Sequence, residues 1–318
     1  MAFFKVALEE LNLSLTLRSG QCFRWRKRAK QDDEGLDVWL GILGRHVVSL
    51  TQNIDKGIIH YSFTTPERRT DNRNISNKKP KIDEESILRE YFQLDVKLSP
   101  LYKSWSSVDP NFKKVASGVP GVRVLKQDPV ENLISFICTS CNNIPRITSM
   151  IHKTCTTFGE LLMTDEEFGD LHAFPTLESL ASEEAAVGLS KLGLGYRAKY
   201  LTATAKMILN GGIRPLDELA SPETSYEEAR SELIKLPGVG RKVADCVCLF
   251  SLNKTQSVPV DTHVYQIACK QYMKYLDAKK KTLSEKDYEV IACFFRDLHG
   301  LNAGWAHSVL FTADLKLK

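Results

Sequence analysis

The sequence predicts an α+β fold, in which an N-terminal antiparallel β-sheet domain precedes a mostly α-helical core. Two patterns in the chain carry this prediction. Residues 10–63 contain short β-rich runs separated by turn-forming residues, whereas apolar residues recur at spacings of three and four from Glu84 onward. With 318 residues, the chain is long enough for two joined domains. We expect the first over residues 1–83 and the second over residues 84–318, whose first and last helices pack partly on the first.

Four runs rich in strand-forming residues make up the expected sheet. They are Cys22–Arg26, Val38–Leu43, Val47–Thr51 and Ile58–Phe63. A charged turn, the pair Gly44-Arg45 and a polar turn ending at Gly57 separate them. Short strands joined by such turns favour antiparallel pairing between neighbours in the sequence.

The second region is expected to contain ten helices, because its apolar residues form faces at helical spacing. The segments are 85–94, 129–141, 145–157, 184–191, 198–208, 225–235, 241–251, 262–271, 286–298 and 303–315. No stretch of about eighteen apolar residues occurs in the sequence, so neither a transmembrane helix nor a membrane partner is expected.

Residues 66–82 form a polar, aperiodic and strongly basic segment. Its six basic and two acidic residues account for the whole formal net charge of +4. We expect a disordered loop inserted in the first domain. Its basic clusters would suit a nuclear-localisation signal, and a simple solvated loop is the alternative. Because the rest of the chain is balanced, affinity for a polyanion must come from local patches.

Residues 236–246 read LPGVGRKVADC and predict two helices joined by a tight hairpin. The first helix ends before Pro237, which cannot continue it, and the second begins near Arg241. Gly238 and Gly240 permit positive φ and bring bare backbone N–H groups to the surface. Such groups at a helix N-terminus bind anions, and beside a basic residue the expected anion is a nucleic-acid phosphate. The alternative is that both glycines serve only the turn.

Lys242 and Asp261 are the candidate catalytic residues. Lys242 falls in the first turn of the second helix, where the dipole disfavours an ammonium and favours the neutral amine that a nucleophile requires. Asp261 follows Val-Pro-Val and precedes His263, in a good N-cap position for another helix. Taken singly, the two residues would be a surface lysine and a capping aspartate.

Together, LPGVGRKVADC and VPVDTH resemble the helix-hairpin-helix plus Gly/Pro…Asp signature of the endonuclease III superfamily of DNA glycosylases. The closer resemblance is to the eukaryotic 8-oxoguanine DNA glycosylase family, and it covers nearly the whole chain. Further matching segments are LRSGQCFRW at 17–25, YFQLD at 91–95, QDP at 127–129, FIC at 136–138, LGLGYR at 192–197, GWA at 304–306 and VLF at 309–311.

The resemblance implies the chemistry of a bifunctional glycosylase and AP lyase. Lys242 would attack C1′, expel the base and leave a Schiff base that β-elimination breaks at the 3′ side. Asp261 would orient or deprotonate the amine and stabilise the developing cation. The positions of Cys246 and Phe311 would sandwich the flipped base, and Gly20 would offer its carbonyl to the N7–H of the oxidised purine.

The same resemblance implies which residues contact DNA. Arg146 and Arg197 would read the cytosine opposite the lesion, and Tyr196 would fill the vacated space. The further contacts expected are Asn142, Gly238, Gly240, Val243 and His263.

Two positions depart from the family pattern. Cys141 stands where the family has a cytosine-reading asparagine, so one contact is expected to be lost, because a thiol is a weak hydrogen-bond partner. His307 stands where the family commonly has a glutamine that bonds the pairing edge of the base. A neutral imidazole offers one donor and one acceptor there.

We therefore expect a monomeric repair enzyme that excises 8-oxoguanine opposite cytosine, and ring-opened purines as a further class, from double-stranded DNA. Nuclear location is expected, with mitochondria as a second place. No cofactor or metal is expected, since the pair Cys138 and Cys141 has zinc spacing but no second pair nearby. Two alternatives stay open: a glycosylase with shifted base specificity, and a non-catalytic DNA-binding module. The intact pair of Lys242 and Asp261 argues against the second.

Overall fold

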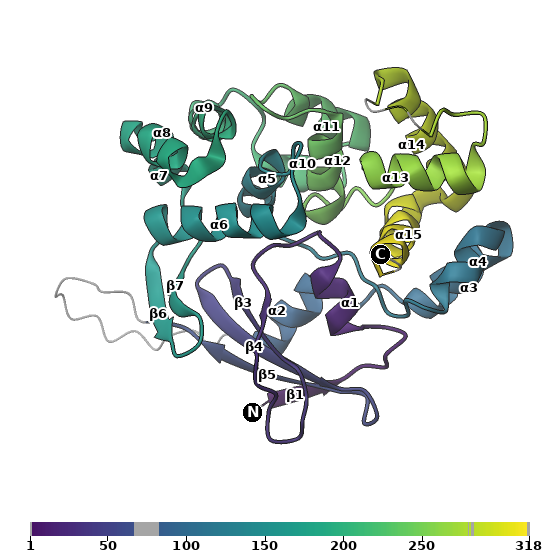
Figure 1. Ribbon diagram of the computed structural model, residues 1–318, viewed down its shortest axis with the longest axis horizontal. Coiled ribbons are helices and arrows are strands. Elements are labelled where there is room, and N and C mark those ends of the chain that lie inside the picture. The colour runs from purple at the N-terminus through teal and green to yellow at the C-terminus, as the bar shows by residue number, and fades with distance from the viewer. Residues whose placement is uncertain (1, 67–82, 279, 281–282, 317–318) are drawn as a thin grey trace.

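A computed structural model describes residues 2–66, 83–278, 280 and 283–316. An antiparallel sheet with its own helices lies below an array of helices, as Figure 1 shows. The predicted α+β class is confirmed. The predicted disordered loop falls on residues 67–82, which lie outside the described residues. Within the described part of the chain, no helix combines the length and apolarity that crossing a bilayer requires.

The N-terminal sheet has five strands among the described residues, in the order β1-β5-β4-β3-β2 with antiparallel neighbours. The strands are β1 Ala2–Lys5, β2 Arg26–Lys27, β3 Val38–Leu43, β4 His46–Asn53 and β5 Ile58–Thr64. Three of the four predicted runs are strands, and β1 was not predicted.

The predicted strand at Cys22–Arg26 is wrong apart from its last residue. Phe23 is buried in the helical core, whereas Cys22 and Trp25 are buried in the core of the sheet. The ring of Trp25 also occupies the space where a side chain at Gly41 would lie. The segment is apolar because it is packed between two cores, and not because it belongs to a β-ladder.

Opposite faces of the sheet are covered by different elements. One face packs on α1 (Leu13–Arg18) and α2 (Glu84–Tyr91) through a cluster that includes Leu17, Leu50 and Leu88. The expected domain division at residue 83 stays a prediction, and α2 belongs to the core of the sheet.

The other face is covered by a hairpin of β6 (Leu161–Asp165) and β7 (Gly169–His172), which lies beside the sheet in Figure 1. The hairpin falls between the predicted helical segments 145–157 and 184–191 and was not predicted. Arg28 fixes the hairpin with two hydrogen bonds to Asp165, of 3.0 and 2.5 Å. The hairpin gains its stability from this docking, which short-range periodicity does not reveal.

The remaining helices form the second layer. They are α3 Leu98–Val108, α4 Pro110–Ala116, α5 Pro129–Ile137, α6 Ile144–Phe158, α7 Leu177–Ala181, α8 Glu183–Leu189, α9 Arg197–Leu209, α10 Leu216–Ala220, α11 Tyr226–Ile234, α12 Arg241–Phe250, α13 Thr262–Ile267, α14 Glu285–His299 and α15 Ala303–Lys316, with short segments of tighter or wider winding at Ser190–Leu194, Ala268–Tyr272 and Gly300–Asn302. All ten predicted helical segments overlap helices, and α3, α4, α7 and α10 were not predicted. The helices share one large core.

Candidate active site

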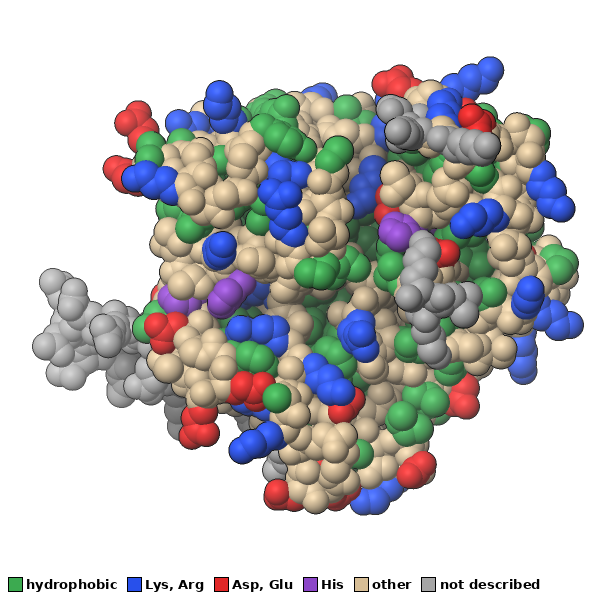
Figure 2. Space-filling view, viewed as in Figure 1, with side chains coloured by type: hydrophobic (Ala, Val, Ile, Leu, Met, Phe, Trp, Pro, Cys, Tyr) green, Lys and Arg blue, Asp and Glu red, His purple; other side chains and the backbone are tan. Residues whose placement is uncertain are grey.

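A cavity of about 790 Å³ lies where the loop after α1, the α5–α6 loop and the helices α12, α13 and α15 converge. In Figure 2 the centre of this face is hollowed, apolar side chains line the hollow, and Lys and Arg side chains are spread around it. Predicted site residues that line the cavity are Gly20, Cys141, Asn142, Gly240, Lys242, Val243, Cys246, Asp261, His263, His307 and Phe311. Both catalytic candidates and all four base-pocket candidates thus meet in one place.

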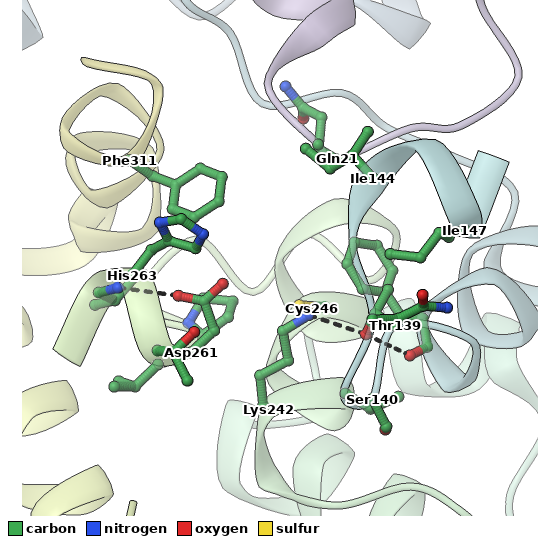
Figure 3. A pocket seen from close by; sticks show the side chains of 18 of the residues that line it. Gln21, Thr139, Ser140, Ile144, Ile147, Lys242, Cys246, Asp261, His263 and Phe311 are labelled. Atoms are coloured by element: carbon green, nitrogen blue, oxygen red, sulfur yellow. Dashed lines mark hydrogen bonds between the residues drawn. The ribbon is translucent and has the colours of Figure 1, made fainter. Parts of the chain in front are cut away.

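Lys242 stands in the first turn of α12, as predicted, and its amine is held by residues at the end of α5. Nζ donates a hydrogen bond to Thr139 Oγ1 at 3.2 Å and lies 4.6 Å from the centre of the Phe136 ring. The Thr139 hydroxyl donates its own hydrogen to the Phe136 carbonyl, at 2.7 Å. Its oxygen is therefore left as an acceptor for the amine. Figure 3 shows the amine turned toward Thr139, with Asp261 lying apart from it.

Thr139 was not among the predicted site residues. The residue lies two positions after the end of α5. A hydroxyl near the end of a helix is common, so the local sequence does not indicate a contact with the amine. Its partner is 103 residues away in the sequence. Only the packing of α5 against α12 reveals the contact.

Cys246 lies one turn after Lys242 and is only 2% exposed. Burial raises the pKa of its thiol to about 12, and the neighbouring Lys242 opposes this effect. The thiol is therefore neutral near pH 7. It presents a small, polarizable surface to the cavity.

Asp261 is the N-cap of α13, which confirms that prediction. Its Oδ1 accepts the Val264 backbone N–H at 2.9 Å. Among the described residues, Oδ2 has no hydrogen-bond partner and neither oxygen pairs with Lys242. One carboxylate oxygen thus stays available in the cavity, at the N-terminal end of α13.

Phe311, His307 and His263 form an aromatic wall. The rings of His307 and Phe311 are stacked, with centroids 6.2 Å apart and an angle of 24° between their planes. The ring of His263 meets Phe311 edge-on at 5.7 Å. The predicted shared face of His307 and Phe311 is confirmed. Phe311 and Cys246 both line the cavity, so a base that enters it would lie near both side chains.

His307 is buried, with 6% exposure. The backbone of Pro259 interacts with its ring, although neither ring nitrogen makes a hydrogen bond of ordinary geometry to the described residues. Burial lowers its pKa to about 4, while the Asp261 carboxylate acts in the opposite direction. A buried polar group without a partner is costly unless a ligand or water supplies one. The neutral imidazole is therefore ready to bond the edge of a polar ligand.

Gly20 adopts φ +77°, in the left-handed region. A Cβ built there would lie 3.1 Å from Ile144 Cδ1 and 3.8 Å from Phe311 Cε1. The positive φ strains any residue that has a Cβ, and the Ile144 side chain would have to shift slightly to admit one. The glycine therefore keeps this side of the cavity open.

The predicted opposite-base residues lie around the α5–α6 loop and do not form one surface. Tyr196 is 52% exposed, and Arg146 is exposed in the first turn of α6. Arg197 is only 4% exposed, and its guanidinium donates to the Ser140 carbonyl and lies 4.6 Å from the ring of Tyr196. In this conformation Arg197 secures the loop that carries Cys141 and lies below the surface.

Cys141 itself is exposed and adopts φ +48°. Next to it, the Asn142 side chain donates to the Cys138 carbonyl at 3.0 Å and stays inside the loop. Cys138 is buried, whereas Cys141 is exposed.

The hairpin before α12 has the predicted position, but its two glycines differ. Gly238 adopts φ +78°, whereas Gly240 is the N-cap of α12 with φ −91°, so the prediction of a left-handed conformation is wrong for Gly240. No atom lies within 4 Å of the position of a Cβ at Gly240. This open space leaves the backbone N–H groups of the first turn accessible to an anion.

Arg241, the basic residue expected to assist that anion site, is engaged elsewhere. Its guanidinium pairs with Glu285 at 2.6 Å and with Glu289 at 3.1 Å. The backbone amides and the helix dipole are thus the features of the hairpin that are left to attract an anion.

Asp245 is a further residue of the hairpin motif that sequence reasoning missed. It is completely buried and accepts hydrogen bonds from Tyr226 at 2.7 Å, from Ser257 at 3.2 Å and from Tyr288, and it pairs with Arg230 at 3.2 Å. A carboxylate on an apolar helix face is tolerated only when it is bonded on all sides. This one ties α12, and with it Lys242, to α11 and α14.

Comparison with known proteins agrees with this site. Residues 3–133 match the family model "8-oxoguanine DNA glycosylase, N-terminal domain", and residues 134–292 match "HhH-GPD superfamily base excision DNA repair protein". The chain is 37% identical to N-glycosylase/DNA lyase OGG1 of Arabidopsis thaliana, over 98% of the chain and 79% of that protein. It is 35% identical to N-glycosylase/DNA lyase of Saccharomyces cerevisiae, over 98% of the chain and 86% of that protein.

Solved structures agree as well. MBOgg1 in complex with a low-affinity DNA ligand has a TM-score of 0.80 and 28% identity, and covers 99% of this chain and 95% of its own. Clostridium acetobutylicum 8-oxoguanine glycosylase/lyase, bound to double-stranded DNA with cytosine opposite 8-oxoguanine, has a TM-score of 0.77 and 30% identity, covering 97% of this chain and 93% of its own. Similarity that spans nearly the whole chain, including the hairpin and both candidate catalytic residues, shows that the chain belongs to the N-glycosylase/DNA lyase family of 8-oxoguanine DNA glycosylases.

Proposed function

We propose that this chain is a bifunctional glycosylase and AP lyase that excises 8-oxoguanine opposite cytosine from double-stranded DNA. The single observation that carries the proposal is the meeting of Lys242, Asp261 and the buried His307 in one cavity. A nucleophile, a carboxylate and a base-reading edge are the three parts that such an excision needs.

The target base enters the cavity by leaving the double helix. Phe311 and Cys246 flank it, and the Gly20 backbone approaches its imidazole edge. The neutral imidazole of His307 accepts one N–H of the pairing edge of guanine.

Lys242 then acts as the nucleophile. Its neutral amine leaves Thr139 and attacks C1′, the glycosidic bond breaks, and the bonding pair departs with the base, which is protonated on release. The Asp261 carboxylate stabilises the cationic sugar in the transition state. Loss of the amine proton and ring opening give a Schiff base, and removal of a C2′ proton expels the 3′ phosphate by β-elimination.

DNA is held in register by the backbone amides at the N-terminus of α12 and by Tyr196, which occupies the space of the extruded base. We include nuclear location in the proposal, since the basic residues of segment 66–82 suit an import signal. Imaging of the fluorescently tagged chain with and without that segment tests this part. Monomeric action is also proposed, and analytical ultracentrifugation with a 1:1 lesion duplex tests it.

Borohydride trapping on four duplexes tests the catalytic proposal. They carry 8-oxoguanine, a ring-opened guanine, an abasic site or no lesion, each opposite cytosine. Trapping on 8-oxoguanine and on the abasic site, and none on undamaged DNA, is the expected result. Trapping on the ring-opened guanine and the abasic site but not on 8-oxoguanine would indicate shifted specificity, and binding without any trapping would indicate a non-catalytic module.

A further inference from the structure

Tyr200 joins the hairpin to Tyr196, although it is not among the residues that line the active-site cavity and has no role in the chemistry described above. It is 40% exposed on α9, one turn after Tyr196. The two rings meet edge to face, with centroids 5.9 Å apart and 76° between their planes. Aromatic pairs of this geometry attract one another beyond their burial.

The opposite side of Tyr200 packs against the backbone of Gly238. A Cβ built on Gly238 would lie 2.7 Å from both Cβ and Cγ of Tyr200, which is too close for any side chain. The glycine is therefore required by its positive φ and also by the approach of this ring. A second contact follows one turn later, where Thr204 Oγ1 donates to the Pro237 carbonyl at 2.8 Å.

The N-terminal end of α9 is fixed to the α5–α6 loop. The Tyr196 hydroxyl donates to the Ser140 carbonyl at 3.4 Å, and Arg197 donates to the same oxygen. The first turns of α9 therefore connect the hairpin to the loop that carries Cys141. Within this connection Tyr200 is the side chain that contacts both the hairpin and the ring of Tyr196.

We propose that Tyr200 is a positioning residue that fixes Tyr196 relative to the hairpin. Phosphate binding at the hairpin and insertion of the Tyr196 ring then occur in one register on the DNA. The inference rests on the proposed function and deepens it, since it assigns the spacing between two DNA contacts to one aromatic pair. Tyr200 acts through Tyr196 and touches no reacting atom.

A double-mutant cycle with Tyr196→Ala tests the proposal. Single-turnover excision of 8-oxoguanine opposite cytosine is measured for the wild type, Tyr200→Leu, Tyr196→Ala and the double variant. Tyr200→Leu should lower the rate roughly three- to tenfold, the loss expected from one aromatic pair. Tyr200→Phe keeps the ring, so its rate should stay within about twofold of the wild-type rate. In the Tyr196→Ala background, Tyr200→Leu should have no further effect.

Two results would overturn the proposal. If Tyr200→Leu lowers the rate equally with and without the Tyr196 ring, Tyr200 acts independently of Tyr196. Equal losses from Tyr200→Phe and Tyr200→Leu would assign the effect to a hydroxyl contact with DNA. Leu209→Ala, at the exposed far end of the same helix, is the matched control and should leave the rate unchanged. If Tyr200→Leu lowers the melting temperature, Tyr200→Met replaces it in the cycle.

The cycle is separable from the proposed function. A wild-type protein that traps on no lesion overturns the proposed function. In that case the four proteins are compared by their affinity for an abasic-site duplex, to which the same additivity criterion applies. A wild-type protein that excises 8-oxoguanine with additive variants overturns only the role of Tyr200.

Discussion

The amine of Lys242 donates a hydrogen bond to the hydroxyl of Thr139, 3.2 Å away, and does not pair with Asp261 among the described residues. The candidate nucleophile is thus held by the end of α5, at a distance from its candidate carboxylate. Because a hydroxyl acceptor and the Phe136 ring both stabilise an ammonium, this is a resting position from which the amine must depart.

Replacing Thr139 should change how readily the amine reacts. Thr139→Val keeps the shape and removes the acceptor that holds the amine at the end of α5, so the amine is freer to move toward C1′. We expect borohydride trapping on an abasic duplex to accelerate about threefold, a modest share of one hydrogen bond. Thr139→Ser should behave as the wild type. Slower trapping in Thr139→Val would show that the hydroxyl guides the attack instead.

Lys242→Gln should abolish the trapped adduct while retaining affinity for damaged duplex, measured by fluorescence anisotropy. Asp261→Asn separates two roles, because asparagine caps a helix as well as aspartate does. The melting temperature should therefore hold, and single-turnover excision should fall roughly 10²-fold or more through the lost charge. A trapped adduct in Lys242→Gln would assign the nucleophile to another residue.

His307 should make the protein sensitive to acid. Its pKa is lowered to about 4 in the folded chain, against about 6.5 unfolded, so the unfolded state binds the proton more tightly. Its contribution to stability is full above pH ~6.5 and is lost progressively as the pH falls toward ~4, by up to about 1.4 kcal/mol per pH unit. Urea denaturation from pH 7 to 4 should show a shallower fall for His307→Gln.

Excision should follow the same titration. Protonation of His307 converts the acceptor into a second donor and removes its bond to guanine. The wild-type rate should therefore fall more steeply than that of His307→Gln as the pH approaches ~5 and below. Overlapping rate profiles would place the base away from His307. The comparison cancels the pH dependence of every other group, because both proteins share those groups.

Cys141→Asn should sharpen the preference for cytosine. The exposed thiol is a weak partner, and an amide adds a donor and an acceptor facing the opposite base. We expect the cytosine-to-adenine ratio of excision rates to rise about three- to tenfold, the effect of one net hydrogen bond. The melting temperature should rise slightly, since asparagine accepts the φ of +48° better than cysteine does. An unchanged ratio would show that position 141 does not face the opposite base.

Asp245→Ala should destabilise the helical core by about 3–5 kcal/mol, because it leaves Arg230 and two tyrosine hydroxyls without their buried partner. Chemical denaturation measures the loss. Glu228→Ala, which removes one half of an exposed capping box on α11, is the control and should cost about 1 kcal/mol or less. A loss for Asp245→Ala as small as that of the control would refute the anchoring role.

The sequence by itself determined the parts of this protein that depend on near neighbours in the chain. Three strands, the ten helical segments, the start of α12 at Arg241 and the cap at Asp261 follow from periodicity, proline and capping chemistry. The shared faces of Lys242 with Cys246, and of His307 with Phe311, follow from helical spacing alone. The list of residues that line the cavity came from the resemblance, which itself rests on short motifs.

Only the tertiary structure decided the contacts between distant segments. The hairpin at 161–172 is a hairpin because the sheet offers it an apolar face, and Arg197 is buried because Ser140 accepts its guanidinium. Thr139 accepts a hydrogen bond from Lys242, and Tyr200 packs on Gly238. Both pairs are too far apart in the sequence for a local pattern to predict them. The physical reason is the same in each case: packing and hydrogen bonding select partners by position in space, whereas sequence periodicity records only which face of an element is buried.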